Sequence, residues 1–210
     1  MTHLHFSAGL RCRTRTEMTT RYNIKQPSLP FDSGFFPCDS IINFLKAPEL
    51  NISVNNTSPC IKYEQTRDQK TNLMGTRFVK TSYDAIDEYI TNNGYSNKYL
   101  DYTKGYYTSL DDYGIVLAHY NWHPSSEEHI TNPEENVDIM NKLLNRRRDR
   151  LFELIDQADI MSIYYFRNAA FMEIDDNRFE LDEDSVRLKL LNYFKDKQVN
   201  FIRIPGSGLF

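Results

Sequence analysis

The chain has 210 residues, with 25 Lys and Arg against 29 Asp and Glu and a net charge of -4 at pH 7. This length suits one domain with a sizeable core, and the charge indicates neither nucleic acid nor an anionic membrane surface as a partner. No apolar run is long enough to cross a bilayer, and the basic N-terminal segment lacks the apolar core of a signal peptide. We therefore expect a cytoplasmic protein without membrane or nucleic-acid partners.

The chain contains three cysteines, Cys12, Cys38 and Cys60, an odd number without regular spacing. This argues against a disulfide framework and indicates a reducing compartment. A free cysteine most often packs in a core, but it can also be a nucleophile when its surroundings favour the thiolate.

The first predicted elements are a strand and a helix joined by a glycine. Residues 3–8 can form the strand, Gly9 permits a tight reversal, and residues 12–22 can continue as a helix. Cys12 would then lie at a helix N-terminus, where free N–H groups and the helix dipole favour a thiolate. This position makes Cys12 the candidate nucleophile.

The next part of the chain gives weaker signals. Pro and Gly predict a loop over residues 28–34, followed by a short helix over about 40–45 that ends before Pro48. Residues 48–75 are rich in Asn, Thr, Ser and Lys, and they predict a polar loop insertion with one weak strand at 60–63.

The second half has clearer periodicity. Apolar spacing predicts an amphipathic helix over residues 82–92, and a β-branched run predicts a strand over 113–119. A longer helix begins at Pro133 and runs to about Gln157, with one apolar face. That face comprises Val137, Met140, Leu144, Leu151 and Ile155. The remaining predicted elements are a strand at 160–166, a helix capped by Asp182, a strand at 199–204 and a flexible tail at 205–210. The residues of that helix expected to point inward are Val186, Leu190, Leu191 and Phe194.

Strands that alternate with helices predict the fold class. We expect a single α/β domain over residues 1–210, with a mainly parallel sheet flanked by helices. Ligands of such sheets bind at the carboxyl ends of the strands. Three features fall at these ends, namely Cys12, His119 and the pair Arg167 and Asn168.

Taken together, several short motifs resemble a family of papain-like cysteine peptidases. The resemblance covers residues 3 to about 170 and depends on the order and spacing of the motifs. They are Gly-Leu-Arg-Cys at 9–12, Ser-Leu-Pro-Phe-Asp at 28–32, the run that starts Tyr-Gly-Ile and ends in His at 113–119, the Arg-rich stretch 146–150 and Tyr-Tyr-Phe-Arg at 164–167. The chain differs from the family in having Ser33 where Trp usually follows the Pro-Phe-Asp segment.

The resemblance implies a Cys-His pair, with Cys12 as nucleophile and His119 as general base. A third polar group would orient the imidazole. The chain order Cys, His, Asn favours Asn168 for this role, whereas Asp32 is the alternative, because a carboxylate better stabilises an imidazolium. The backbone N–H groups of Cys12 and Arg13 can form an oxyanion hole. Arg13, Phe31 and Arg167 are the candidate substrate-binding residues, and no cofactor is expected.

Each candidate also has a structural alternative. His119 can be a hydrogen-bonded structural residue, and Asp32 can be a turn-forming side chain that accepts from local backbone N–H groups. Asn168 can simply end a strand, and Phe31 can pack in the core.

Two further parts of the sequence concern metal and anion binding. His119 and His123 are four residues apart, a spacing that can hold a metal on a helix, and His129 follows; Pro124 and the predicted strand argue against a helix there, so no metal site is expected. The basic stretch 145–150 is most simply a solvated helix face, although arginines also match phosphate and carboxylate groups.

Two hypotheses for function remain. The first is an intracellular thiol hydrolase or acyl transferase that acts on an amide, ester or thioester. The alternative is a non-catalytic module that binds an anionic or glycan-type ligand through Arg167, His119 and the basic helix. The sequence does not determine the oligomeric state.

Overall fold

The structure is a computed structural model, which describes residues 1–8, 13–32, 34–62, 66–70, 74–82, 84–85, 106–118, 133–166, 171–180 and 183–204. These residues form helices and two sheets, so the α/β class is confirmed. Of the helix predicted over 82–92, only residues 84–85 are described as helical, and the predicted tail at 205–210 lies outside the described residues.

The smaller sheet, called here the parallel sheet, contains three of the predicted strands. They are β1 (His3–Ser7), β8 (Ile160–Phe166) and β11 (Gln198–Ile204), in the order β1-β8-β11. Both strand pairs are parallel, with Phe6 opposite Ile163 and Ile163 opposite Phe201. The strands predicted at 3–8, 160–166 and 199–204 are therefore confirmed.

The larger sheet, called here the mixed sheet, has the strand order β10-β9-β5-β3-β6-β7-β2, with β4 paired to β5. Its strand pairs are antiparallel, except that β5 and β9 are parallel. The expectation of a mainly parallel sheet thus describes only the smaller sheet. The strands are β2 (Gly34–Phe35), β3 (Thr57–Lys62), β4 (Thr66–Arg67), β5 (Met74–Lys80), β6 (Tyr106–Leu110), β7 (Ile115–Ala118), β9 (Phe171–Ile174) and β10 (Asn177–Glu180).

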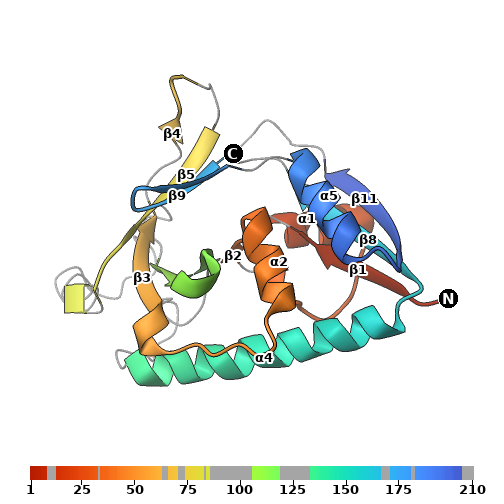
Figure 1. The fold of residues 1–210 in the computed structure, drawn as a ribbon, viewed down its shortest axis with the longest axis horizontal. Helices are drawn as coiled ribbons and strands as arrows, with labels where there is room; N and C mark the ends of the chain where they lie inside the picture. The colour runs from red at the N-terminus through yellow and green to blue at the C-terminus, as the bar shows by residue number, and fades with distance from the viewer. Residues whose placement is uncertain are drawn as a thin grey trace.

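The long helix α4 (Pro133–Gln157) explains this difference from the expectation. It follows β7 of the mixed sheet and precedes β8 of the parallel sheet, so it passes from one sheet to the other. A strand, a helix and a strand in sequence usually indicate a crossover within one sheet. Figure 1 shows α4 running beneath both sheets along the length of the molecule.

The other described helices are α1 (Arg13–Tyr22), α2 (Cys38–Lys46) and α5 (Glu183–Tyr193). Ala47 after α2 is extended, as expected for a residue that precedes Pro48. Short 3-10 turns occur at η1 (Pro30–Asp32), η2 (Val54–Asn56) and η4 (Asp111–Tyr113). Helix α2 lies between the two sheets, with α5 beside it (Figure 1). None of the helices within the described ranges is long and apolar enough to cross a membrane.

The main core lies where α4 and α2 meet the two sheets. All five residues of the predicted apolar face of α4 are buried, so that face is confirmed. Aromatic rings fill the centre, with Phe31 in edge-to-face contact with Phe6, Phe36 and Phe44 at centroid distances of 5.0 to 5.4 Å. Such pairs are favourable beyond the area that they bury. Leu190 of α5 and Phe194, which directly follows that helix, are buried as predicted, whereas Val186 and Leu191 are only half-buried.

The segment 48–75 contains more strand than its composition predicts. The turn η2 leads into β3, and β4 and the start of β5 follow. Pro59 lies opposite Thr108 of β6, and it directly precedes Cys60, where the pairing of β3 with β5 begins. Proline has no N–H to donate, so it is tolerated where a strand is paired on one side. The segment is therefore an integral part of the mixed sheet.

Candidate functional site

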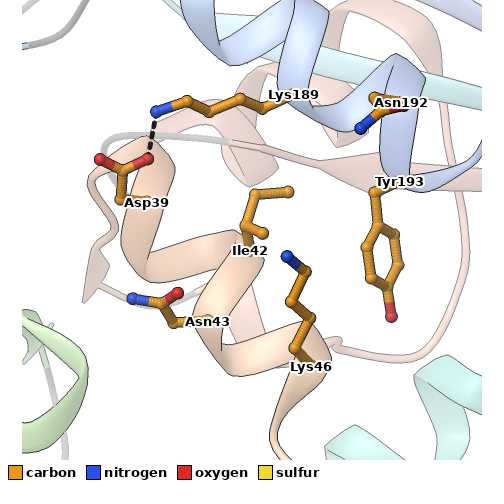
Figure 2. A pocket seen from close by; sticks show the side chains of 7 residues that line it. All are labelled: Asp39, Ile42, Asn43, Lys46, Lys189, Asn192 and Tyr193. Atoms are coloured by element: carbon orange, nitrogen blue, oxygen red, sulfur yellow. Dashed lines mark hydrogen bonds and ion pairs between the residues drawn. The ribbon is translucent and has the colours of Figure 1, made fainter.

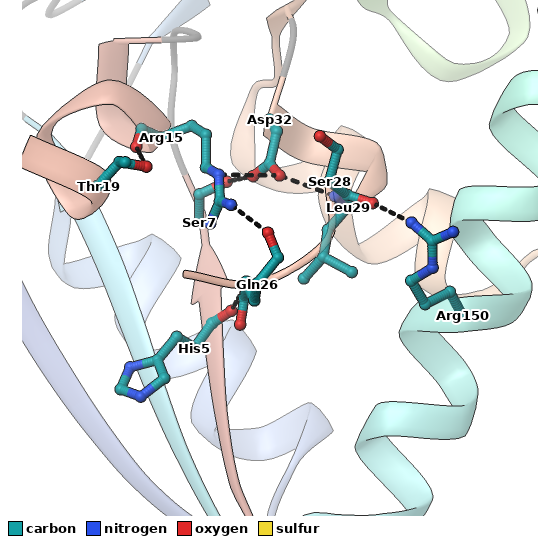
Figure 3. A network of polar contacts seen from close by, with 9 residues as sticks. All are labelled: His5, Ser7, Arg15, Thr19, Gln26, Ser28, Leu29, Asp32 and Arg150. Atoms are coloured by element: carbon teal, nitrogen blue, oxygen red, sulfur yellow. Dashed lines mark hydrogen bonds and ion pairs between the residues drawn. The ribbon is translucent and has the colours of Figure 1, made fainter. Parts of the chain in front are cut away.

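Asp32 is the centre of a buried polar network at the C-terminal end of β1 (Figure 3). Its side chain is in the turn η1, and the residue is only 5% exposed. The Ser7 hydroxyl donates to Oδ1 at 2.7 Å, and the Leu29 backbone N–H donates to Oδ2 at 2.7 Å. The Arg15 Nε lies 3.6 Å from Oδ2. One carboxylate thus contacts the last residue of β1, the loop before η1 and the first turns of α1.

The environment of this carboxylate acts on its pKa in two directions. Burial raises the pKa of Asp32, because a charged group loses its hydration. The hydrogen bonds from Leu29 and Ser7, and the charges of Arg15 and Arg147, lower it. Burial is the larger effect, so the pKa of Asp32 lies above its usual value.

The network continues from Arg15 along the loop that follows α1. The Arg15 Nη2 donates to the Gln26 carbonyl at 2.5 Å, and the Gln26 side chain donates to the His5 carbonyl. Arg150 of α4 donates to the Ser28 carbonyl at 3.1 Å. Residues 26–32 are therefore fixed to β1, α1 and α4 together (Figure 3).

The strand β2 connects this network to the mixed sheet. It begins at Gly34, two residues after Asp32, and pairs antiparallel with β7. Gly34 lies opposite Leu117, which is two residues before His119. Gly34 has a φ of 157° and packs so closely that a Cβ there would lie 2.7 Å from the Val116 carbonyl oxygen. A larger residue would therefore separate β2 from β7.

Four of the predicted site residues, Cys12, His119, Arg167 and Asn168, lie outside the described residues. Arg13 is the first residue of α1, and its backbone alone is described. Described elements flank these positions in the sequence. Cys12 lies between β1, which ends at Ser7, and α1, which begins at Arg13. His119 directly follows β7, which ends at Ala118, and Arg167 and Asn168 directly follow β8, which ends at Phe166.

Phe31 belongs to the core and not to a substrate-binding surface. It is 1% exposed and is enclosed by Phe6, Phe36 and Phe44. A side chain with so little exposed area has no surface for a substrate to contact. This placement fits the alternative that Phe31 packs in the core, and it does not fit a substrate-binding role.

Sequence reasoning identified Asp32 but missed Ser7, Arg15 and Gln26. Ser7 gave a weak signal, because it is a polar residue at the end of a strand whose apolar residues Leu4 and Phe6 are buried. Arg15 and Gln26 gave none, since the sequence from 13 to 28 is polar almost throughout. Their contacts depend on the way the loop after α1 returns to β1.

Cys60 is a structural cysteine. It is fully buried in a small apolar cluster of the mixed sheet, which includes Phe35, Phe78 and Val116. Burial raises the pKa of its thiol to about 12, so it stays protonated at neutral pH. Cys38 begins α2, and its side chain lies outside the described residues.

The basic stretch of α4 is divided between structural contacts and solvent. Arg148 donates to the Ala47 carbonyl and stacks over Phe152, 4.6 Å from the ring centroid. Arg150 holds Ser28, and Arg147 contributes to the potential at Asp32. Arg146 lines a shallow pocket of about 460 Å³, together with Lys142, Asp149, Arg150 and Glu153. The stretch is therefore not a uniform cationic surface.

A second pocket, of about 440 Å³, lies between α2 and α5 (Figure 2). Asn43 and Lys46 of α2 and Asn192 of α5 are among the polar groups that line it, and Tyr193 contributes its ring. The Tyr193 hydroxyl is occupied, because it donates to the Leu45 carbonyl at 3.0 Å. The ion pair between Lys189 and Asp39 closes one end (Figure 2).

Comparison with known proteins found no matching family model, no similar curated protein and no similar solved structure. Within the part of the chain that the structure describes, no three His, Cys, Asp or Glu side chains gather in a way that could hold a metal ion. A functional proposal for this chain therefore depends on its residues and their geometry.

Proposed function

We propose that this protein is a cysteine-dependent hydrolase or acyl transferase, in which Cys12 is the nucleophile and His119 is the general base. The observation that carries the proposal is the set of contacts made by Asp32. This buried carboxylate connects the chain segments on both sides of Cys12 to the strand pair that precedes His119.

The chain on both sides of Cys12 is fixed to Asp32. Ser7, at the end of β1, donates to Oδ1, and Arg15, one turn into α1, pairs with Oδ2. Five residues separate Ser7 from Arg13, where α1 begins. Cys12 directly precedes α1, which supports the expectation that the helix dipole stabilises its thiolate.

The register of the mixed sheet supports the pairing with His119. Gly34 lies opposite Leu117, and because the two strands are antiparallel, Asp32 and His119 each lie two residues beyond this pair, at the same end of the strand pair. Oδ1 of Asp32 accepts from Ser7 alone among the described residues, and a carboxylate oxygen can accept a second hydrogen bond. Asp32 is therefore suited to orient an imidazole at position 119.

Asn168 stays the alternative orienting residue. It follows β8, which is parallel to β1, so both strands end at the same edge of the parallel sheet. The Ala8 N–H donates to the Tyr164 carbonyl at 2.8 Å and extends the pairing beyond Ser7. Arg167 follows the same strand and is our candidate for binding an anionic group of the substrate.

The chemistry is a two-step acyl transfer. The Cys12 thiolate forms a bond to the carbonyl carbon, and the N–H groups of Cys12 and Arg13 stabilise the oxyanion. The leaving amine, alcohol or thiol departs with a proton from the His119 imidazolium. Water, or another acceptor, then attacks the thioester while His119 removes its proton, which releases Cys12 as the thiolate. These steps need no cofactor, and a free thiolate suits the reducing cytoplasm.

The experiment is site-resolved alkylation of the full chain with iodoacetamide at pH 6, followed by mass spectrometry of the cysteine peptides. We expect Cys12 to be modified at least about tenfold faster than Cys38, since only a thiolate reacts quickly, whereas the buried Cys60 should stay unmodified whether or not Cys12 is activated. His119→Ala should remove the difference between Cys12 and Cys38, and the matched control His129→Ala should preserve it. Equally slow modification of Cys12 and Cys38 in the native sequence would contradict the proposal.

The second candidate is a non-catalytic module that binds an anionic or glycan-type ligand. The observation that favours it is the pocket between α2 and α5, which is lined by the amides of Asn43 and Asn192, the amine of Lys46 and the Tyr193 ring. Amide donors beside an aromatic ring suit a sugar. This module would be favoured if Cys12 is alkylated as slowly as Cys38 and if the protein binds an oligosaccharide. Asn192→Ala should then abolish that binding.

A further inference from the structure

We propose that His3 and His5 form a chelating site for a divalent transition metal ion on the outer face of the parallel sheet. The site is separate from the Cys12 region, and the inference does not rest on the proposed function. Imidazole nitrogens are preferred ligands of Ni²⁺, Cu²⁺ and Zn²⁺, so these ions are the class that the site would take.

The backbone of β1 places the two rings together. Residues two apart on a strand project from the same face, and His3 and His5 project away from the core side that holds Leu4 and Phe6. The ring centroids are 4.3 Å apart, with an angle of 28° between the ring planes. Two imidazoles this close are placed so that both can ligate one ion.

Each ring is also oriented by a hydroxyl group of β8. The His3 Nε2 lies 2.8 Å from the Ser162 Oγ, and the His5 Nδ1 lies 3.0 Å from the Tyr164 hydroxyl. The other nitrogens, Nδ1 of His3 and Nε2 of His5, have no hydrogen-bond partner among the described residues. Metal-binding histidines are typically held by a hydrogen bond at the nitrogen that does not bind the metal. The two hydroxyls supply such hydrogen bonds.

The surface around the pair is open on one side. Helix α1 covers the C-terminal half of this sheet face, where Tyr22 packs on Tyr164 at 5.3 Å and Met18 is buried. His3, at the other end, is exposed, and the exposed Asn200 of β11 lies in register with Ser162. Two histidines satisfy only part of a coordination sphere, so water or a further ligand would complete it.

The test is isothermal titration of the full chain with Ni²⁺ at pH 7.5, in a buffer that does not bind the metal. We expect one ion per chain, and His3→Gln and His5→Gln should each weaken binding at least about tenfold. Glutamine keeps a polar group beside β8 but is a poor nickel ligand, and circular dichroism of each variant confirms its fold. Ser162→Ala, which removes one orienting hydroxyl, should also weaken binding by about tenfold or more.

Two controls separate this site from the others. His129→Gln should leave nickel affinity unchanged, as should Cys12→Ser, so failure here is distinguishable from failure of the proposed thiol chemistry. Unchanged affinity in either His3→Gln or His5→Gln would overturn the inference, because the proposed site needs both imidazoles. Loss of nickel binding in His129→Gln or Cys12→Ser would also overturn the inference, because other residues would then bind the ion.

Discussion

At the scale of single residues, the buried carboxylate of Asp32 has the most consequences. The sequence suggested two roles for it, an orienting group and a turn-forming side chain. The structure shows the hydrogen bond from the Leu29 N–H that the second role requires, and it adds contacts to Ser7 and Arg15 that no local pattern predicted. The two roles are compatible, because a carboxylate held by several donors is also well positioned to accept another.

Replacing Asp32 with Asn should destabilise the protein. An amide cannot accept from both the Ser7 hydroxyl and the Leu29 N–H in this geometry, and Arg15 loses its charged partner. We expect the free energy of unfolding at pH 7, measured in urea, to fall by about 1–3 kcal/mol. Asp39→Asn is the matched control, because the Asp39 side chain is 73% exposed, and it should change stability by less than about 0.5 kcal/mol. Equal effects of the two substitutions would contradict this account.

Comparison of the native protein with Asp32→Asn also gives a prediction for the pH dependence of stability. Burial raises the pKa of Asp32 in the folded state, so the folded protein binds this proton more tightly than the unfolded chain does. The stability contributed by Asp32 is therefore complete below its unfolded pKa of about 4 and declines as the pH rises through the folded pKa. The difference in unfolding free energy between the native sequence and Asp32→Asn should narrow from pH 3 to pH 7. A difference that widens would mean that hydrogen bonds and Arg15 outweigh burial.

Cys60 provides a second prediction for a single residue. Its buried thiol, with a pKa of about 12, should stay unmodified by iodoacetamide at pH 8 in the folded protein. It should react fully in 6 M guanidinium chloride, where it is exposed. Peptide mass spectrometry distinguishes it from Cys12 and Cys38. Rapid modification of Cys60 under native conditions would show that the cluster around Phe78 and Val116 opens readily.

At the scale of elements, strongly periodic segments were predictable and irregular ones were not. The helix from Pro133 to Gln157 and the strand at 160–166 have the bounds expected from the sequence. The hairpin of β9 and β10 was missed, since its strands have four residues each and its turn depends on Asp175 with a φ of 51°. Strand β5 was missed because Gly75, Thr76 and Arg77 interrupt its apolar pattern.

Gly75 permits the parallel pairing of β5 with β9. A Cβ at this position would lie 2.1 Å from the Phe171 ring, so no side chain fits without movement of the ring. We expect Gly75→Ala to lower the free energy of unfolding by about 1–3 kcal/mol, measured in urea. Adding Phe171→Leu should recover part of this loss, with Phe171→Leu alone as the control. If the free energy of unfolding of Gly75→Ala equals that of the native protein, β5 and β9 are not packed as described.

At the scale of the whole molecule, the contacts near Asp32 depend on the way α4 joins two sheets. The sequence indicates strands and helices in the right order, but it does not indicate which strands share a sheet. We expected β7 and β8 in one sheet, whereas β7 pairs with β6 and β2, and β8 pairs with β1 and β11. Pairing between distant segments is set by tertiary packing, which single-sequence periodicity does not record.

This arrangement also determines which candidate residues can meet. The loop from 26 to 32 receives Arg15 from α1, Ser7 from β1 and Arg150 from α4, and it continues into β2 beside β7. The three predicted strand ends therefore belong to two sheets that meet near Asp32. The central claim is that this meeting point activates Cys12 through His119.

The most direct test is the pH dependence of the rate at which iodoacetate alkylates Cys12, measured for the full chain and for His119→Ala. An activated pair should keep the Cys12 rate high at pH 5–6, well below the pKa of about 8.5 of a free thiol. In His119→Ala the rate should fall at these pH values and rise only near the free-thiol pKa. If both proteins show the same single rise near pH 8.5, Cys12 and His119 do not act together, and the account is wrong.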